Sequence, residues 1–95
     1  MNVIFRDNGQ TARLELPLRF VFSEHSSFRQ KLLQVRAAPA VRTLELDFSK
    51  VEYIDSAALG MLRCLIEAEK RLQVRLLHPC RPVRELLEMA NLQPG

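Results

Sequence analysis

The sequence predicts an α/β fold: a four-stranded mixed sheet in the order β-β-α-β-α-β-α, with the helices packed mainly on one face. Short segments in which every second residue is apolar are typical of strands, and longer segments with apolar residues three and four apart are typical of helices. After an initial hairpin, strands and helices alternate, which requires parallel strands joined by right-handed crossovers. A length of 95 residues is that of one domain, which we expect to extend over residues 1–95.

The first element is a predicted β-hairpin. Strands over residues 3–6 and 12–16 flank a turn in which Asn8-Gly9 supplies the positive φ angles that a tight turn requires. In the second strand three apolar residues alternate with two charged ones, so one face of the sheet is buried and the other lies in water. These residues are Ala12, Leu14 and Leu16, and Arg13 and Glu15.

A helix is predicted over residues 23–36, after a connection over residues 18–22. Ser23 belongs to the residue types that cap helix N-termini. The helix must end before Pro39, because the residue that precedes a proline avoids helical angles. The apolar side chains expected on its buried side are Phe28, Leu32, Leu33 and Val35.

The strand over residues 41–48 predicts that helices cover only one face of the sheet. Apolar and acidic side chains alternate along it, whereas a strand buried on both faces is continuously apolar. Leu44, Leu46 and Phe48 point to one face, and Glu45 and Asp47 point to the other.

The rest of the chain repeats the helix-strand alternation. A loop over residues 49–54 leads into a second helix over residues 55–71, and a strand over residues 74–77 follows. The last helix has Pro82 at its first position and stops at Asn91.

Composition and charge limit the classes of partner. The net charge of +3 comes from 14 basic and 11 acidic residues, which are scattered along the chain. Nucleic-acid readers concentrate positive charge on one face and interleave aromatic residues, so we expect no nucleic-acid partner. No apolar run approaches the roughly 20 residues of a membrane span, and no signal-peptide pattern is found. We therefore expect a cytoplasmic protein without a membrane partner, in which Cys64 and Cys80 are free thiols.

The segment that follows residue 54 combines a helix start with an unusual glycine. Asp55 and Ser56 stand where a loop turns into a helix, and either side chain can accept hydrogen bonds from the first turn. Taken alone, this pair is typical of an ordinary helix cap. Gly60 costs about 1 kcal/mol relative to alanine inside a helix, so we expect it to allow close approach to the sheet or to a partner.

This segment resembles the signature of the STAS family, in particular its anti-sigma factor antagonists. The family has a strand that ends in Leu-x-Leu-Asp, then an aromatic residue followed by Ile or Met and Asp-Ser, then two small residues and Leu-Gly. The matching residues here are 44–47, 53–56 and 57–60. The order of the elements is also similar, and the resemblance covers about residues 1–92. It implies a STAS-like fold and a partner-switching regulator with no catalytic activity and no cofactor.

The resemblance also implies residue roles and partners. Ser56 is the phospho-acceptor, and Asp55 caps the helix and orients the hydroxyl of Ser56. An anti-sigma factor or related serine kinase binds the unmodified form, and a serine phosphatase removes the phosphate. We expect the chain itself to be a monomer or weak dimer.

We expect the partner to contact residues on both sides of the acceptor. Cys80 is included because adjacent parallel strands end on the same side of a sheet, and Met61 also fits the apolar stripe of its helix. The expected contact residues are Val21, Phe22, Ser23, Tyr53, Ile54, Ala57, Ala58, Met61 and Cys80.

Three features depart from the family pattern. Ala57 and Ala58 replace a Ser or Thr and a Gly, which leaves Ser56 as the sole hydroxyl of the motif. Val21 stands where relatives often have a carboxylate. Many relatives continue beyond the position of Gly95 with another strand and helix, so we expect a C-terminal end shorter than usual.

The residues also admit other functions. A nucleophilic Ser56 would need His25 or His78 as its base, and a metal site would have to combine both histidines with both cysteines, without the Cys-x-x-Cys spacing of zinc sites. We expect neither. One alternative to the sigma-factor switch is a non-phosphorylated docking subunit of a larger complex, such as a lipid-transport system. Another is a switch that acts on a different output, such as a diguanylate cyclase.

Overall fold

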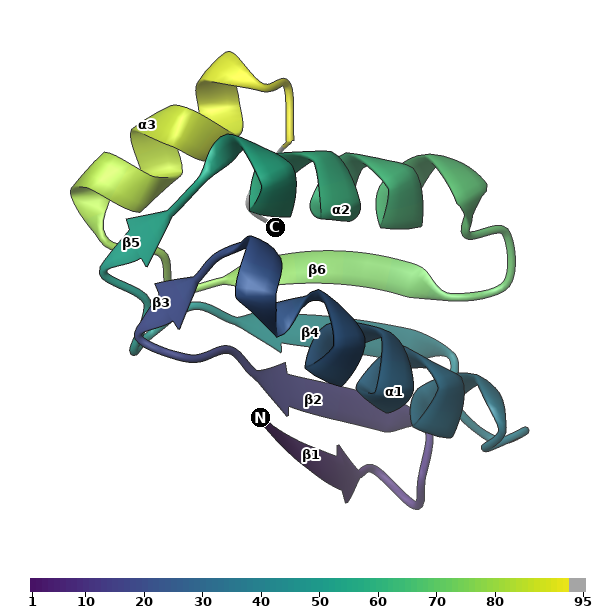
Figure 1. The fold of residues 1–95 in the computed structure, drawn as a ribbon. Coiled ribbons are helices and arrows are strands. Elements are labelled where there is room, and N and C mark those ends of the chain that lie inside the picture. Colours follow the sequence, from purple (N-terminus) through teal and green to yellow (C-terminus); the bar gives the residue numbers. More distant parts are fainter. Residues whose placement is uncertain (93–95) are drawn as a thin grey trace.

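A four-stranded sheet in the order β1-β2-β4-β6 lies at the centre of the computed structural model, which describes residues 1–92 (Figure 1). Its strands are β1 (Asn2–Arg6), β2 (Thr11–Glu15), β4 (Thr43–Asp47) and β6 (Gln73–Leu77). β1 is antiparallel to β2, whereas β2, β4 and β6 are parallel. The predicted mixed sheet is confirmed. The end of the predicted domain, residues 93–95, lies outside the described residues.

The hairpin turn owes its shape to three successive residues with left-handed backbone angles. Asp7, Asn8 and Gly9 have φ values of 57°, 59° and 81°. Asp, Asn and Gly are the residue types that tolerate this region best. The N–H of Gly9 donates to the carbonyl of Arg6 over 3.1 Å and closes the turn. The hairpin is confirmed, with each strand beginning one residue earlier than expected.

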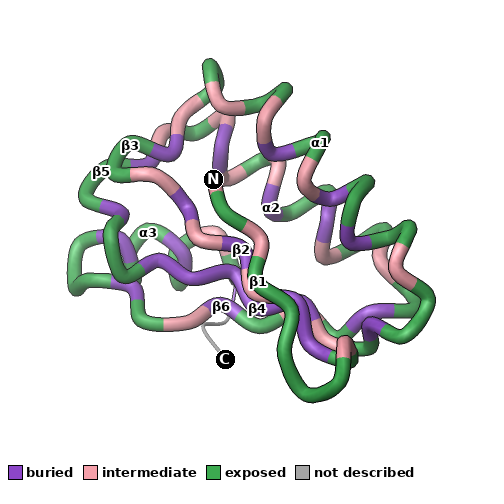
Figure 2. The backbone as a smooth tube through the Cα atoms, turned by 90° about the horizontal axis from the view of Figure 1, so that it is seen from below, coloured by how far each residue is buried: buried purple, intermediate pink, exposed green. Residues whose placement is uncertain are grey.

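Three α-helices accompany the sheet: α1 (His25–Arg36), α2 (Ser56–Ala68) and α3 (Arg81–Met89). α1 and α2 connect successive parallel strands and lie side by side on the same face of the sheet (Figures 1 and 2). α3 is joined to α2 by a hydrogen bond from the Arg63 guanidinium to the carbonyl of Ala90. In the part of the chain that is described, no helix has the length and apolar character needed to cross a bilayer.

The core lies between the sheet and the helices. Residues at every second position of the parallel strands meet residues three and four apart on the helices, as the two periodicities require. One expectation for α1 was wrong: the Leu33 side chain is 56% exposed, because it points away from the sheet. The largest fully buried side chains of this core are Phe20, Phe48, Leu14, Leu16, Leu44, Leu46, Leu62, Leu76 and Leu87, and Phe28, Leu32 and Leu65 of the helices are buried beside them.

The helix boundaries differ from the prediction by one to three residues, and Pro82 is the second residue of α3, not the first. Ser23 does not cap α1, because it lies inside a short 3-10 helix, η1 (Phe22–Glu24), and the N-cap position is taken by Glu24. α2 ends at Ala68 instead of residue 71. There the Glu69 carboxylate accepts hydrogen bonds from the N–H groups of Arg71 and Leu72, each over 3.1 Å. Such local bonds give the backbone an alternative to the helical pattern.

A second sheet of two very short strands was not predicted. β3 (Arg19–Phe20) and β5 (Tyr53–Ile54) pair in parallel, with Arg19 opposite Tyr53. The sequence analysis interpreted both segments as connections, because two residues are too few to show a periodic pattern. The pairing brings the start of α1 next to the start of α2 (Figure 1).

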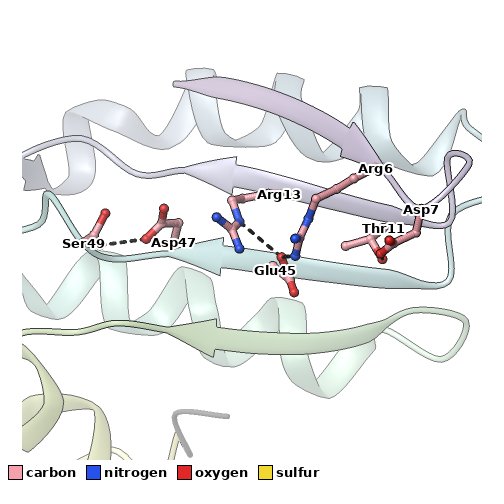
Figure 3. Close-up of polar contacts among 7 residues, drawn as sticks. All are labelled: Arg6, Asp7, Thr11, Arg13, Glu45, Asp47 and Ser49. Carbon is pink, nitrogen blue, oxygen red and sulfur yellow. Dashed lines mark hydrogen bonds and ion pairs between the residues drawn. The ribbon is translucent and has the colours of Figure 1, made fainter.

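The face of the main sheet opposite α1 and α2 carries charged side chains, as predicted, although Glu45 and Asp47 on that face are buried. The Glu45 carboxylate forms ion pairs with the guanidinium groups of Arg6 and Arg13, which extend over it (Figure 3). Asp47 accepts a hydrogen bond from the N–H of Ser49 over 2.9 Å. The aliphatic stems of arginine can cover a neighbouring residue while their charged ends stay in water.

Candidate protein-docking site

Asp55 and Ser56 lie at the start of α2. Asp55 has extended backbone angles and is the N-cap residue, and Ser56 is the first residue of the helix. One carboxylate oxygen of Asp55, Oδ1, accepts a hydrogen bond from the N–H of Ala58 over 2.8 Å. This bond satisfies one of the N–H groups that every helix leaves without a partner in its first turn.

The second carboxylate oxygen of Asp55 links α2 to η1. Its Oδ2 accepts a hydrogen bond from the N–H of Phe22 over 3.1 Å. One carboxylate thus supports the beginnings of both helical segments. Both bonds are made to backbone groups and neither involves the hydroxyl of Ser56, so the orienting role implied by the resemblance stays a prediction.

The hydroxyl of Ser56 is accessible at the positive end of a helix. Ser56 is exposed, and within residues 1–92 its side chain makes no hydrogen bond. The N–H groups of Ser56 and Ala57 are also without a partner there, because the helical pattern begins only at Leu59. A negative group attached to Ser56 would lie next to these donors and to the positive end of the helix dipole.

Two exposed aromatic rings lie on the segments that adjoin the start of α2, η1 and β5. Phe22 is 66% exposed and stacks on His25, with 6.1 Å between the ring centroids. Tyr53 is 49% exposed, and the Arg19 guanidinium lies 4.8 Å from its ring centroid. Exposed aromatic rings beside polar groups are typical of surfaces that bind other proteins.

The other expected contact residues divide into accessible and buried ones. Ser23 and Cys80 are exposed, and the Cys80 thiol lies 3.6 Å from the carbonyl of Val51. Val21, Ala57 and Met61 are half-buried.

Ile54 and Ala58 were wrongly expected to contact a partner. They are 4% and 0% exposed and belong to the core. Ile54 is held there by the β3–β5 pairing, and Ala58 lies on the buried side of α2 together with Leu62.

A groove between α1 and α2 was missed. It has a volume of about 460 Å³ and is open to solvent. Gly60, Met61 and Cys64 line it from α2, and Phe28 and Arg29 are among the residues that line it from α1. The unexplained glycine was the one signal in the sequence that could have indicated it.

The alternative chemistries gain no geometric support. Neither histidine forms a hydrogen bond with Ser56 in the described residues. Over the same residues, no three His, Cys, Asp or Glu side chains come close enough together to hold a metal ion.

Comparisons with known proteins agree with this fold. The family described as "Mlab, STAS domain" matches residues 3–93. A STAS-domain containing protein of Pseudomonas aeruginosa (strain UCBPP-PA14) is 31% identical over 88 residues, which are 90% of this chain and 85% of that protein.

A similar fold is found in the inward-facing structure of the murine Solute Carrier 26 family member A9 anion transporter, with a TM-score of 0.69 and 21% identity. That similarity covers 84% of this chain but only 14% of the transporter chain, so it concerns the fold of one part of the transporter. Together with the family match over residues 3–93, these findings show that the chain belongs to the STAS domain family.

Proposed function

We propose that this STAS domain is a partner-switching regulator whose docking surface surrounds Ser56 and is controlled by reversible phosphorylation of that residue. The partner is an anti-sigma factor or related serine kinase, and a serine phosphatase restores the unmodified form. The observation that carries the proposal is the exposed Ser56 at the start of α2, beside the exposed ring of Phe22.

Phosphorylation at this position leaves the domain folded. The phosphate brings about −1.5 to −2 charges near neutral pH. The free N–H groups of Ser56 and Ala57 are available to it, and the positive end of a helix stabilises a negative charge by about 0.3–2 kcal/mol. No core residue has to move, because Ser56 is exposed whereas Ala58 provides the buried contact.

The same charge releases the partner. A carboxylate of the partner about 6 Å from the phosphate would be repelled by about 5 kcal/mol at an effective dielectric constant near 20. If salt halves this energy, the affinity still falls by one to two orders of magnitude.

Mass spectrometry and binding assays of Ser56 variants test the proposal. Protein recovered from its own cells is expected to carry one phosphate on Ser56, located by fragmentation. Ser56→Ala should bind the partner constitutively, and Ser56→Asp should bind it at least tenfold more weakly. Gln34→Glu, which adds one negative charge to an exposed position of α1, is the control and should bind like wild type. If Ser56→Asp and Ser56→Ala both bind like wild type, the switch is wrong.

A second candidate function is permanent docking in a larger complex, such as a lipid-transport system. The exposed rings of Phe22 and Tyr53 favour it, because a permanent contact would cover them in the same way as a switched one. In that case the protein from its own cells would carry no phosphate on Ser56 and would stay bound to its complex through purification.

A further inference from the structure

The groove between α1 and α2 has a feature that the fold does not explain. Gly60 lines it, in the interior of an α-helix where glycine is unfavourable. The sequence predicted that this glycine allows close approach to the sheet or to a partner. A Cβ atom added to Gly60 would meet no atom within 4 Å, so packing against the sheet is not the reason for the glycine. Its missing side chain instead keeps one wall of the groove open.

The groove has an apolar floor. Phe28 and Leu32 of α1 and Leu65 of α2 contribute their side chains to it, and half-buried Met61 lies beside them. The volume of about 460 Å³ lies within the range of about 300–1,000 Å³ that is usual for binding clefts. α1 and α2 lie side by side on one face of the sheet (Figures 1 and 2). The open groove between them offers a shape into which a third helix can pack.

The charged side chains that line the groove are two arginines. Arg29 and Arg36 line it from α1, together with His25, and no Asp or Glu is among its lining residues within the described chain. Arg36 already pairs with Glu69 over 3.3 Å, whereas the side chain of Arg29 has no ion pair or hydrogen bond within residues 1–92. The occupant should therefore carry acidic groups on the side that faces α1.

The groove continues the surface around Ser56. Ser56 and Gly60 are four residues apart and lie on the same face of α2. On α1 the groove begins at His25, whose ring stacks on the exposed ring of Phe22. A partner that covers Ser56 can therefore extend into the groove without a break in contact.

We propose that the α1–α2 groove binds an acidic amphipathic helix of the partner protein. This inference rests on the proposed function in that the helix belongs to the partner that covers Ser56. Apolar side chains at i, i+4 and i+7 of the helix fill the groove, and a carboxylate beside them pairs with Arg29.

Titration with synthetic peptides tests the groove without the partner. The probe is a capped helical peptide of about 15 residues with leucines at i, i+4 and i+7 and glutamates on one flank. A matched peptide has lysines in place of the glutamates. The acidic peptide should shift the amide NMR signals of Gly60 and Cys64 and bind about tenfold more tightly than the basic one.

Three variants make the result specific. Gly60→Leu fills the groove and should abolish binding of the acidic peptide. Arg29→Glu should reverse the preference, so that the basic peptide binds more tightly. Arg84→Glu makes the same charge change at an exposed position of α3 outside the groove and should keep the original preference.

Several results would overturn the inference. These are no binding of the acidic peptide at about 1 mM, equal binding of both peptides, or unchanged binding to Gly60→Leu. Binding of dodecanoate in the groove without binding of the acidic peptide would assign it to a small amphiphile instead. The peptide experiment does not depend on Ser56, so a failure of the acidic peptide to bind would contradict the groove proposal but not the phosphorylation switch. Binding of the acidic peptide together with an unmodified Ser56 in cells would contradict only the switch.

Discussion

At the scale of single residues, Asp55 is the side chain on which the geometry of the site depends most. It accepts hydrogen bonds from Ala58, inside α2, and from Phe22, at the start of η1. A capping role could be predicted from the sequence, because Asp is a common N-cap residue and an apolar helix follows it. The second bond could not, because it joins segments 33 residues apart and depends on the unpredicted β3–β5 pairing.

Replacing Asp55 should therefore destabilise the whole domain. Asp55→Ala removes both acceptors and is expected to lower the free energy of unfolding by about 1–2 kcal/mol. Asp55→Asn keeps one good acceptor for the N–H of Ala58 and should lose roughly half as much. Urea unfolding measures both. Glu52→Ala removes an exposed carboxylate nearby and should change stability by less than about 0.5 kcal/mol. An Asp55→Ala variant as stable as Glu52→Ala would contradict the assigned role.

At the scale of elements, the sequence was most informative where an apolar pattern extends over many residues or where a residue type favours one backbone conformation. The parallel strands and the three helices were predicted with ends within a few residues of the observed ones. Each contains several apolar side chains at the spacing typical of a strand or of a helix. The stop of α3 was confirmed: Asn91 has a φ of 60°, and the N–H of Leu92 donates to the carbonyl of Leu87 over 2.8 Å. The α1–α2 groove was missed, because a groove depends on the distance between two helices, which neither helix encodes alone.

Gly60→Ala is expected to stabilise α2 by about 0.5–1 kcal/mol, because alanine favours the helix and its Cβ meets nothing within 4 Å. Thermal unfolding should show a midpoint several degrees higher. Gly9→Ala is the matched control with the opposite sign, since Gly9 has a φ of +81°, which disfavours any side chain. A lower midpoint for Gly60→Ala would mean that the glycine serves the isolated fold after all.

At the scale of the whole molecule, the two ends of the sheet differ in the contacts that their residues make. The carboxyl ends of β2, β4 and β6 lie on the side of β3, β5 and the start of α2, where we propose the docking surface (Figure 1). At the opposite end, Glu69 accepts hydrogen bonds from the N–H groups of Arg71 and Leu72 and pairs with Arg36 of α1. Arg71 in turn donates to the carbonyls of Val41 and Arg36. This end therefore connects segments that are far apart in the sequence.

Glu69 should make the stability of the domain depend on acidity. Burial alone would raise the pKa of Glu69, but the hydrogen bonds from Leu72 and Arg71 and the pairing with Arg36 together hold that pKa below the usual value of 4.5. A lowered pKa in the folded state means that the stabilisation is complete above about pH 4.5 and is lost as the pH falls through the lower folded value.

At pH 7 Glu69→Gln should be less stable than wild type by about 1 kcal/mol, and the difference should shrink below about pH 4. Urea unfolding at a series of pH values measures both effects, with exposed Glu67→Gln as the control, for which no such change is expected. If Glu69→Gln lost the same stability at pH 3 and at pH 7, the negative charge of Glu69 would not be the source of its stabilisation.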